Sequence, residues 1–107
     1  MNPKVEDMLR LISRRWTLPV MNELTKGIRS HNDLARAVGA DNKQLARVLQ
    51  PLVHKKLVYR KVHATTSPVR VYYSLTPRGK AIAGFCSELN LAITTAMDPD
   101  LRGQRAG

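Results

Sequence analysis

The sequence predicts a mainly α-helical domain with one small β-hairpin in its second half. Apolar residues recur every three or four positions along most of the chain, whereas residues 57–75 contain two runs rich in β-branched and aromatic residues with alternating character. A chain of 107 residues is long enough for one hydrophobic core and one domain. Its composition, 43% hydrophobic and 24% charged, is that of a folded protein and argues against disorder.

Two helices are expected before residue 27. A short amphipathic helix ending near residues 13–15 is indicated by apolar residues at helical spacing, namely Val5, Met8, Leu9 and Ile12. Thr17 is expected to cap the second helix. Pro19 is tolerable in the first turn of that helix, and Gly27 is expected to end it.

A third and a fourth helix are separated by a turn of only Gly39 and Ala40. Ser30 is expected to cap the third helix, which ends at Gly39 and directs three residues inward: Leu34, Ala37 and Val38. Asp41 is expected to cap the fourth helix, and Gln44 three residues later makes a variant of the capping box.

The fourth helix has one apolar and one polar face. The apolar face is expected to pack inward through Leu45, Val48, Leu49 and Leu52. The opposite face presents hydrogen-bonding side chains, which are Lys43, Arg47, Gln50 and His54. Pro51 removes a backbone hydrogen bond at a cost of about 3 kcal/mol, so a kink or an early break is expected there.

Residues 57–63 and 69–75 are predicted to form two strands, joined by a loop over residues 64–68. Alternate residues of a strand share a face, so Arg70 and Tyr72 are expected to point away from the core. The opposite face is expected to be buried through Val69, Val71, Tyr73 and Leu75.

Thr76 and Pro77 are expected to begin a long last helix. Its apolar stripe consists of Ile82, Phe85, Cys86, Leu89, Ile93 and Met97. The apolar surface of this stripe is larger than a domain of this size can bury by itself. The stripe therefore predicts a homodimer. We expect residues 1–97 to form the domain, with the terminal helices at the dimer interface, and residues 98–107 to form a flexible tail.

Two helices joined by a short turn and followed at once by a hairpin have the layout of a winged helix-turn-helix. The charge pattern supports a polyanionic partner, because nine cations and no acidic residue lie between Asp41 and Glu88 in a chain of net charge +10. The phosphate backbone of nucleic acid is the commonest such partner. A basic face that only aids solubility is the plain alternative.

With these features the chain resembles the HxlR-type winged helix-turn-helix regulators, relatives of the MarR and ArsR groups. The resemblance runs from about residue 12 to residue 82 and rests on residues 16–19, 23–24, 32–34, 39–45, 49, 52, 57–58, 70–76 and 79. It implies a dimeric bacterial transcription factor paired through its terminal helices. The recognition helix would enter the major groove, and the hairpin, or wing, would lie against the backbone or minor groove. Family members often carry a sensing cysteine ahead of the first helix, and residues 1–13 contain none here.

These considerations assign base reading to Lys43, Gln44 and Arg47, and phosphate binding to Arg60, Lys61 and Arg70. The residues expected to contact duplex DNA are Asn42, Lys43, Gln44, Arg47, Arg60, Lys61, His63, Thr65, Thr66 and Arg70. The expected dimer interface consists of Val5, Met8, Leu9, Phe85, Cys86, Leu89, Ile93 and Met97. His54 and Lys55 are not assigned to the DNA contacts, because the kink or early break expected at Pro51 would change their positions.

Two other functions stay open. One is a protein-interaction module whose basic residues dock onto an acidic partner. The other is RNA binding, for which only Tyr59 and Tyr72 offer aromatic stacking.

No catalytic, metal or cofactor site is expected. Cys86 is the single cysteine, the three histidines lack the spacing of a metal site, and no glycine-rich phosphate loop follows a strand. Trp16 and Tyr73 are expected in the core, with a ligand cavity beside Trp16 as the alternative. The early acidic residues and the absence of a spanning apolar run predict a cytoplasmic protein.

Overall fold

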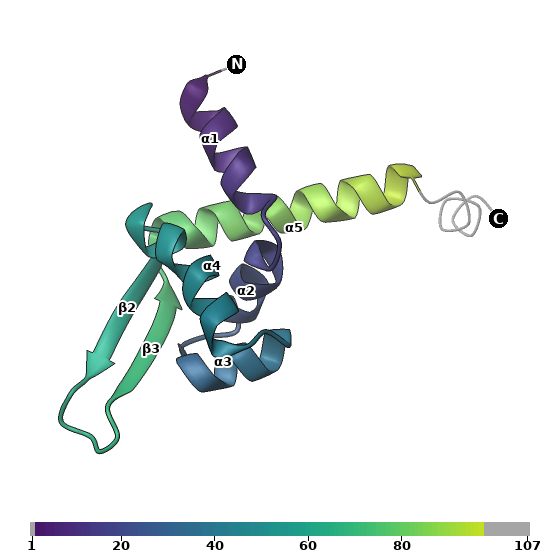
Figure 1. Ribbon diagram of the computed structural model, residues 1–107. Coiled ribbons are helices and arrows are strands. Elements are labelled where there is room, and N and C mark those ends of the chain that lie inside the picture. Colours follow the sequence, from purple (N-terminus) through teal and green to yellow (C-terminus); the bar gives the residue numbers. More distant parts are fainter. Residues whose placement is uncertain (1, 98–107) are drawn as a thin grey trace.

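The computed structural model describes residues 2–97, which form five helices and one three-stranded antiparallel sheet (Figure 1). The elements in order are α1 (Pro3–Ile12), α2 (Thr17–Leu24), β1 (Arg29–Ser30), α3 (His31–Val38), α4 (Asn42–His54), β2 (Val58–His63), β3 (Arg70–Leu75) and α5 (Pro77–Met97). The predicted mainly helical, winged helix-turn-helix fold is confirmed. The expected tail over residues 98–107 lies outside the described residues.

Helices α2, α3 and α4 form the body of the domain, and the β2–β3 hairpin projects from it (Figure 1). Helix α5 runs across the domain and extends beyond it, while α1 points away on the side opposite the hairpin loop. The core lies between these elements, and its most deeply buried side chains are Val20, Met21, Leu34, Leu45, Leu49, Leu52 and Leu57.

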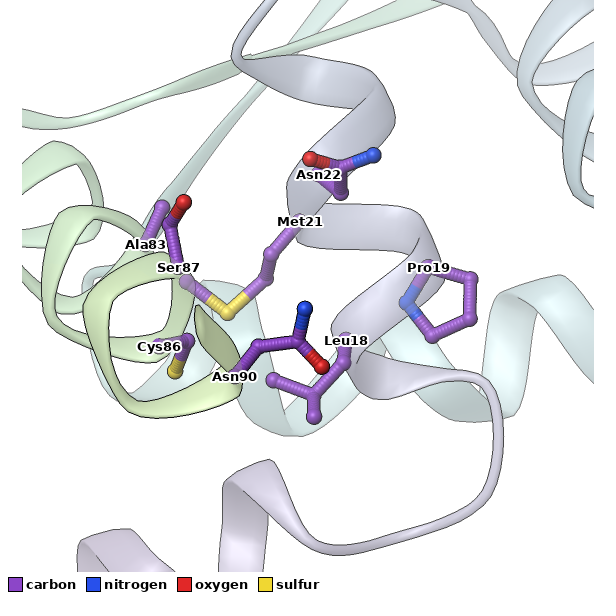
Figure 2. Close-up of a pocket in the computed structure, with 8 residues that line it drawn as sticks. All are labelled: Leu18, Pro19, Met21, Asn22, Ala83, Cys86, Ser87 and Asn90. Carbon is purple, nitrogen blue, oxygen red and sulfur yellow. The ribbon is translucent and has the colours of Figure 1, made fainter. Parts of the chain in front are cut away.

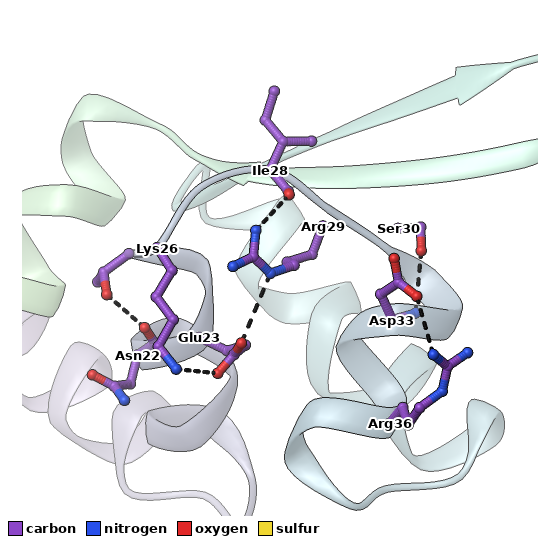
Figure 3. Close-up of polar contacts among 9 residues, drawn as sticks. Asn22, Glu23, Lys26, Ile28, Arg29, Ser30, Asp33 and Arg36 are labelled. Atoms are coloured by element: carbon purple, nitrogen blue, oxygen red, sulfur yellow. Dashed lines mark hydrogen bonds and ion pairs between the residues drawn. The ribbon is translucent and has the colours of Figure 1, made fainter.

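Local capping explains the helix-turn-helix. The backbone N–H of Asp33 donates to Ser30 Oγ at 3.1 Å, which caps α3 (Figure 3). Gly39 ends that helix with a φ of 76°, a left-handed conformation that favours glycine. At the start of α4 the Gln44 N–H donates to Asp41 Oδ1 at 2.8 Å, and the Asp41 N–H donates to Gln44 Oε1 at 3.0 Å. The predicted caps of α3 and α4 and the capping box are therefore confirmed.

Strand β1 was not predicted. It pairs with β3, which lies at the centre of the sheet, with Arg29 opposite Tyr73 and Ser30 opposite Tyr72. Figure 3 shows Arg29 reaching back toward Glu23 of α2, where Nε lies 3.8 Å from Oε1. A strand of two residues has no alternating pattern, so only its pairing with β3 defines it.

The prediction that Thr17 caps α2 was wrong. Trp16 occupies that position with a φ of 76°, and Thr17 is the first helical residue, buried to 1% exposure. Trp16 was also expected in the core, yet it is only half-buried, with the Arg15 guanidinium 4.9 Å from the centre of its ring. The left-handed backbone at Trp16 turns the chain between α1 and α2.

Two residues expected in the core are exposed. On α3, Ala37 faces solvent and Ala35 is buried instead. The helix packs between α2 and α4 through the face shared by Leu34, Ala35 and Val38, and Ala37 lies about 100° around the helix axis from Val38, outside that face. Val69 is 57% exposed, since the paired register of the hairpin ends at His63 and Arg70 and leaves Val69 in the loop.

Of the kink or early break expected at Pro51, the early break was wrong, because α4 continues to His54. Leu49 and Leu52 on either side of Pro51 are buried to 2% and 0% exposure. Burial of one leucine side chain contributes about 1.5–3 kcal/mol, which is comparable to the cost of an internal proline of about 3 kcal/mol. The Lys55 N–H donates to the Pro51 carbonyl at 2.9 Å and completes the last turn.

Candidate nucleic-acid interface

Helix α4 presents a polar surface that is anchored from behind. Leu45, Leu49 and Leu52 are almost fully buried and fix how the helix is turned about its axis. Asn42, Lys43 and Arg47 are consequently exposed on its outer side. Gln44 is half-buried, and its Oε1 is engaged in the capping box, so its amide nitrogen is the part left to donate outward.

The wing carries cations on both of its faces. Lys61 lies opposite Tyr72, and His63 lies opposite Arg70, so these residues share one face of the β2–β3 ladder. Arg60 lies opposite Tyr73 on the other face, the face that turns toward the helical body. There Arg60 borders a hollow of about 570 Å³ whose other lining residues are His31, Ala46, Gln50, Val53, Val71 and Tyr73. The two predicted phosphate-binding neighbours Arg60 and Lys61 are thus separated by the sheet.

The hairpin loop exposes both predicted threonines. Thr66 is held within the turn, where its Oγ1 lies 2.9 Å from the His63 carbonyl oxygen and 3.0 Å from that of Pro68. His63 packs edge-on against Tyr72 with ring centres 4.8 Å apart. Thr65 remains exposed and makes the loop surface polar.

Positive charge on this surface is not neutralised within the described part of the chain. The ion pairs among residues 2–97 use Arg10, Lys26, Arg29 and Arg36 with Asp7, Glu23 and Asp33. None of them includes Lys43, Arg47, Arg60, Lys61 or Arg70. An anionic partner would therefore meet these cations without first breaking an ion pair.

Residues 2–97 also bring together polar groups that were not assigned from the sequence. Gln50, which was expected on the outer face of α4, lines the same hollow as Arg60 of the wing. Arg14 and Arg15, from the turn between α1 and α2, border one hollow together with Arg47. No sequence pattern relates Arg14 and Arg15 to Arg47, so only the fold could reveal this neighbourhood.

The terminal helices expose apolar side chains. Among the predicted interface residues, Phe85, Leu89, Ile93 and Met97 of α5 and Val5 of α1 are 39–76% exposed, and Met8, Leu9 and Cys86 are half-buried. Between α1, α2 and α5 lies a groove of about 470 Å³, and its apolar lining is Leu9, Ile12, Leu18, Cys86, Leu89 and Ile93.

Cys86, which belongs to the apolar stripe of α5, is half-buried. Figure 2 shows its side chain on α5, beside a hollow of about 310 Å³ that α5 forms with Leu18, Pro19, Met21 and Asn22 of α2. Burial disfavours the thiolate and raises the pKa of the Cys86 thiol above its ordinary value.

Cys86 is therefore expected to be slow to react at neutral pH. The thiolate is the reactive form, and a raised pKa lowers its population below that of an unperturbed thiol. The rate of alkylation by iodoacetamide, measured by mass spectrometry from pH 7 to 10, should stay below that of glutathione and reach its plateau at a higher pH. The same property predicts that peroxide leaves the DNA binding that the sequence resemblance implies unchanged in both the wild type and Cys86→Ser. Loss of binding in the wild type alone would identify Cys86 as a sensor.

No helix in the described range 2–97 has both the length and the apolar character needed to cross a membrane. Within the same range, no three His, Cys, Asp or Glu side chains are grouped so that they could hold a metal ion.

Comparison with known proteins identifies relatives across almost the whole chain. The model of a family described as HxlR-like helix-turn-helix matches residues 11–100. The uncharacterized HTH-type transcriptional regulator YvaP of Bacillus subtilis is 31% identical over 100 residues, which cover 92% of each chain. The HTH-type transcriptional regulator YodB of the same organism is 30% identical over 90 residues, 83% of this chain and 80% of YodB. The structure of reduced YodB superposes with a TM-score of 0.82 at 27% identity, covering 92% of this chain and 97% of that one.

Proposed function

Since the chain belongs to the HxlR-like helix-turn-helix family and is a transcriptional regulator, not an enzyme, we propose that it binds duplex DNA sequence-specifically as a homodimer. Helix α4 enters the major groove, and the wing lies against the backbone or the minor groove. The observation that carries this proposal is the exposed, unpaired positive charge shared by α4 and the wing.

Base reading is assigned to Lys43 and Arg47, which project from the outer side of α4, with a contribution from the Gln44 amide nitrogen. Arginine and lysine suit the N7 and O6 acceptors of guanine in the major groove. Phosphate binding is assigned to the wing, where Lys61 and Arg70 lie on one face and Arg60 on the other. Asn42, His63, Thr65 and Thr66 are proposed as further contacts at the ends of these two elements.

Arg47→Ala is expected to cost about 1–3 kcal/mol of binding free energy on the operator and much less on random duplex DNA. The reason is that a bidentate contact to a base exists only at the correct sequence. Fluorescence anisotropy with operator and random duplexes, the operator being selected from a random library, measures both affinities.

Arg70→Ala should instead lower the affinity for the operator and for random duplex DNA by similar factors. Each lost phosphate contact reduces the salt dependence of log K by about one unit, or about two for a dimer. The isotherms are therefore repeated at several salt concentrations. If Arg47→Ala and Arg70→Ala lower operator and random affinity in the same ratio, the assigned division between α4 and the wing is wrong.

The homodimer is proposed from the apolar side chains that α1 and α5 leave exposed. Monomeric soluble proteins rarely expose large apolar patches, and such patches usually mark a surface that binds another molecule. Symmetric pairing of α5 with its copy would bury Phe85, Leu89, Ile93 and Met97 and give the assembly two α4 helices, the number that reading two half-sites requires.

Docking of the basic residues onto an acidic protein is the competing function. Random duplex DNA separates the two cheaply, because a regulator binds it with an affinity that falls as salt rises. An interaction module would show no salt-dependent DNA binding, and that result would refute the proposed function.

A further inference from the structure

We propose that Arg14 and Arg15, at the turn between α1 and α2, form a second phosphate-binding site that clamps the DNA backbone on the side of α4 away from the wing. The inference rests on the proposed function, because it requires α4 to lie in a major groove. Its two new contacts, Arg14 and Arg15, come from a turn that is neither recognition helix nor wing, and they face α4 across a hollow that α4 helps to line.

The site is a hollow with three arginines around it. Its volume is about 240 Å³, and its lining consists of Arg14, Arg15, Thr17, Arg47, Val48 and Pro51. Liquid water occupies about 30 Å³ per molecule, so the hollow is roomy enough for a phosphodiester group in place of several waters. The arginine guanidinium offers planar paired donors that match the oxygens of a phosphate.

No carboxylate in the described chain neutralises these arginines. The ion pairs within residues 2–97 include neither Arg14, Arg15 nor Arg47, and the hollow has no acidic lining residue. Arg14 and Arg15 are exposed, so a ligand in the hollow can reach their side chains from solvent. Three like charges around one hollow repel one another, and a bound anion would relieve that repulsion.

The backbone holds this turn in place. The Arg14 N–H donates to the Leu11 carbonyl at 3.2 Å, and the Thr17 N–H donates to the Arg14 carbonyl at 3.2 Å. Thr17 is buried, and the Arg15 guanidinium lies 4.9 Å from the centre of the Trp16 ring. The two arginines are therefore presented from an anchored turn, which lowers the entropy lost when they bind a phosphate.

The position of this hollow on one flank of α4 explains why we propose a phosphate as the ligand. Arg47, Val48 and Pro51 border this hollow, whereas Ala46, Gln50 and Val53 border the hollow that contains Arg60 of the wing. The two sets lie on opposite flanks of the same helix. A helix with its side chains is about 10–12 Å across and a major groove is about 12 Å wide, so a helix in the groove faces phosphates of both strands. The wing would contact phosphates of one DNA strand, and Arg14 and Arg15 would contact phosphates of the other.

The test uses the full chain and random duplex DNA, because phosphate contacts do not require the operator. The Arg14→Gln/Arg15→Gln variant is compared with Lys4→Gln/Lys26→Gln, which removes the same charge from exposed positions outside the hollow. Binding is measured by anisotropy between about 50 and 200 mM salt. The arginine variant should bind more weakly and reduce the salt slope by about two units per protomer, while the lysine variant keeps the wild-type slope.

Equal salt slopes for the two variants, with the wild type binding DNA normally, would overturn this inference and leave the proposed function intact. Failure of the wild type to bind duplex DNA would refute the proposed function and the inference with it. Because loss of Arg15 also removes its contact with Trp16, Arg14→Gln alone is a second variant, for which the expected loss is about one unit per protomer. A wild-type slope for that variant also counts against the site.

Discussion

Changing Leu89 and Ile93 of α5 together to Asp is expected to give monomers whose affinity for operator DNA is lower by about 10²–10⁴-fold. Both side chains belong to the exposed apolar stripe and line the groove between α1 and α5. Two carboxylates placed on that face would be buried without partners in a dimer, which is unfavourable by several kcal/mol. Without pairing, the second half-site no longer binds as an intramolecular event, and the gain from linkage is lost.

Light scattering gives the mass of this variant, and anisotropy on the operator gives its affinity. Leu91→Asp is the matched control, because Leu91 is 61% exposed on the same helix but lies about 200° around the axis from Leu89. It should remain dimeric with wild-type affinity. A dimer that survives the double substitution, or one that Leu91→Asp disrupts, would place the interface elsewhere.

Gly79→Ala is expected to destabilise the fold by about 3 kcal/mol or more. Gly79 is buried in the first turn of α5, where a Cβ would overlap the carbonyl oxygen of Leu57 and lie 2.9 Å from its carbonyl carbon. That oxygen already accepts a hydrogen bond from the Thr76 N–H at 3.0 Å, and Thr76 Oγ1 bonds the neighbouring Lys56 carbonyl at 2.6 Å. Because these atoms are backbone on both sides, the added methyl group can be accommodated only by separating α5 from the start of the wing.

Gly84→Ala is the control for that substitution. It lies on the same helix, and a Cβ there would meet nothing within 4 Å. Alanine favours a helix over glycine by about 1 kcal/mol, so this variant should be slightly more stable than the wild type. Urea unfolding at one fixed protein concentration compares the three proteins, since the proposed dimer would make stability depend on concentration. Equal midpoints for Gly79→Ala and the wild type would show that α5 and Leu57 are not packed this closely.

The sequence by itself determined the features whose signals are local. Ser30, Gly39 and Asp41 delimit the two helices of the helix-turn-helix because their caps involve backbone groups within three or four residues. The spacing of Leu45, Leu49 and Leu52 likewise predicts which side of α4 faces the core. The strands of the wing were predicted from their alternation, and the polar side of α4 followed from the apolar one.

Tertiary structure alone decided the features that depend on residues far apart in the chain. Strand β1 exists only through its pairing with β3, and Pro51 stays helical because burial of its neighbours offsets the lost hydrogen bond. Because successive residues of a strand point to opposite faces, the sequence predicts that Arg60 and Lys61 lie on different faces of the wing. Only the packing of the wing against α4 shows that Arg60 is the one that faces the helix. The approach of Arg14 and Arg15 to Arg47 has no local signal, because it follows from the packing of three helices around one core.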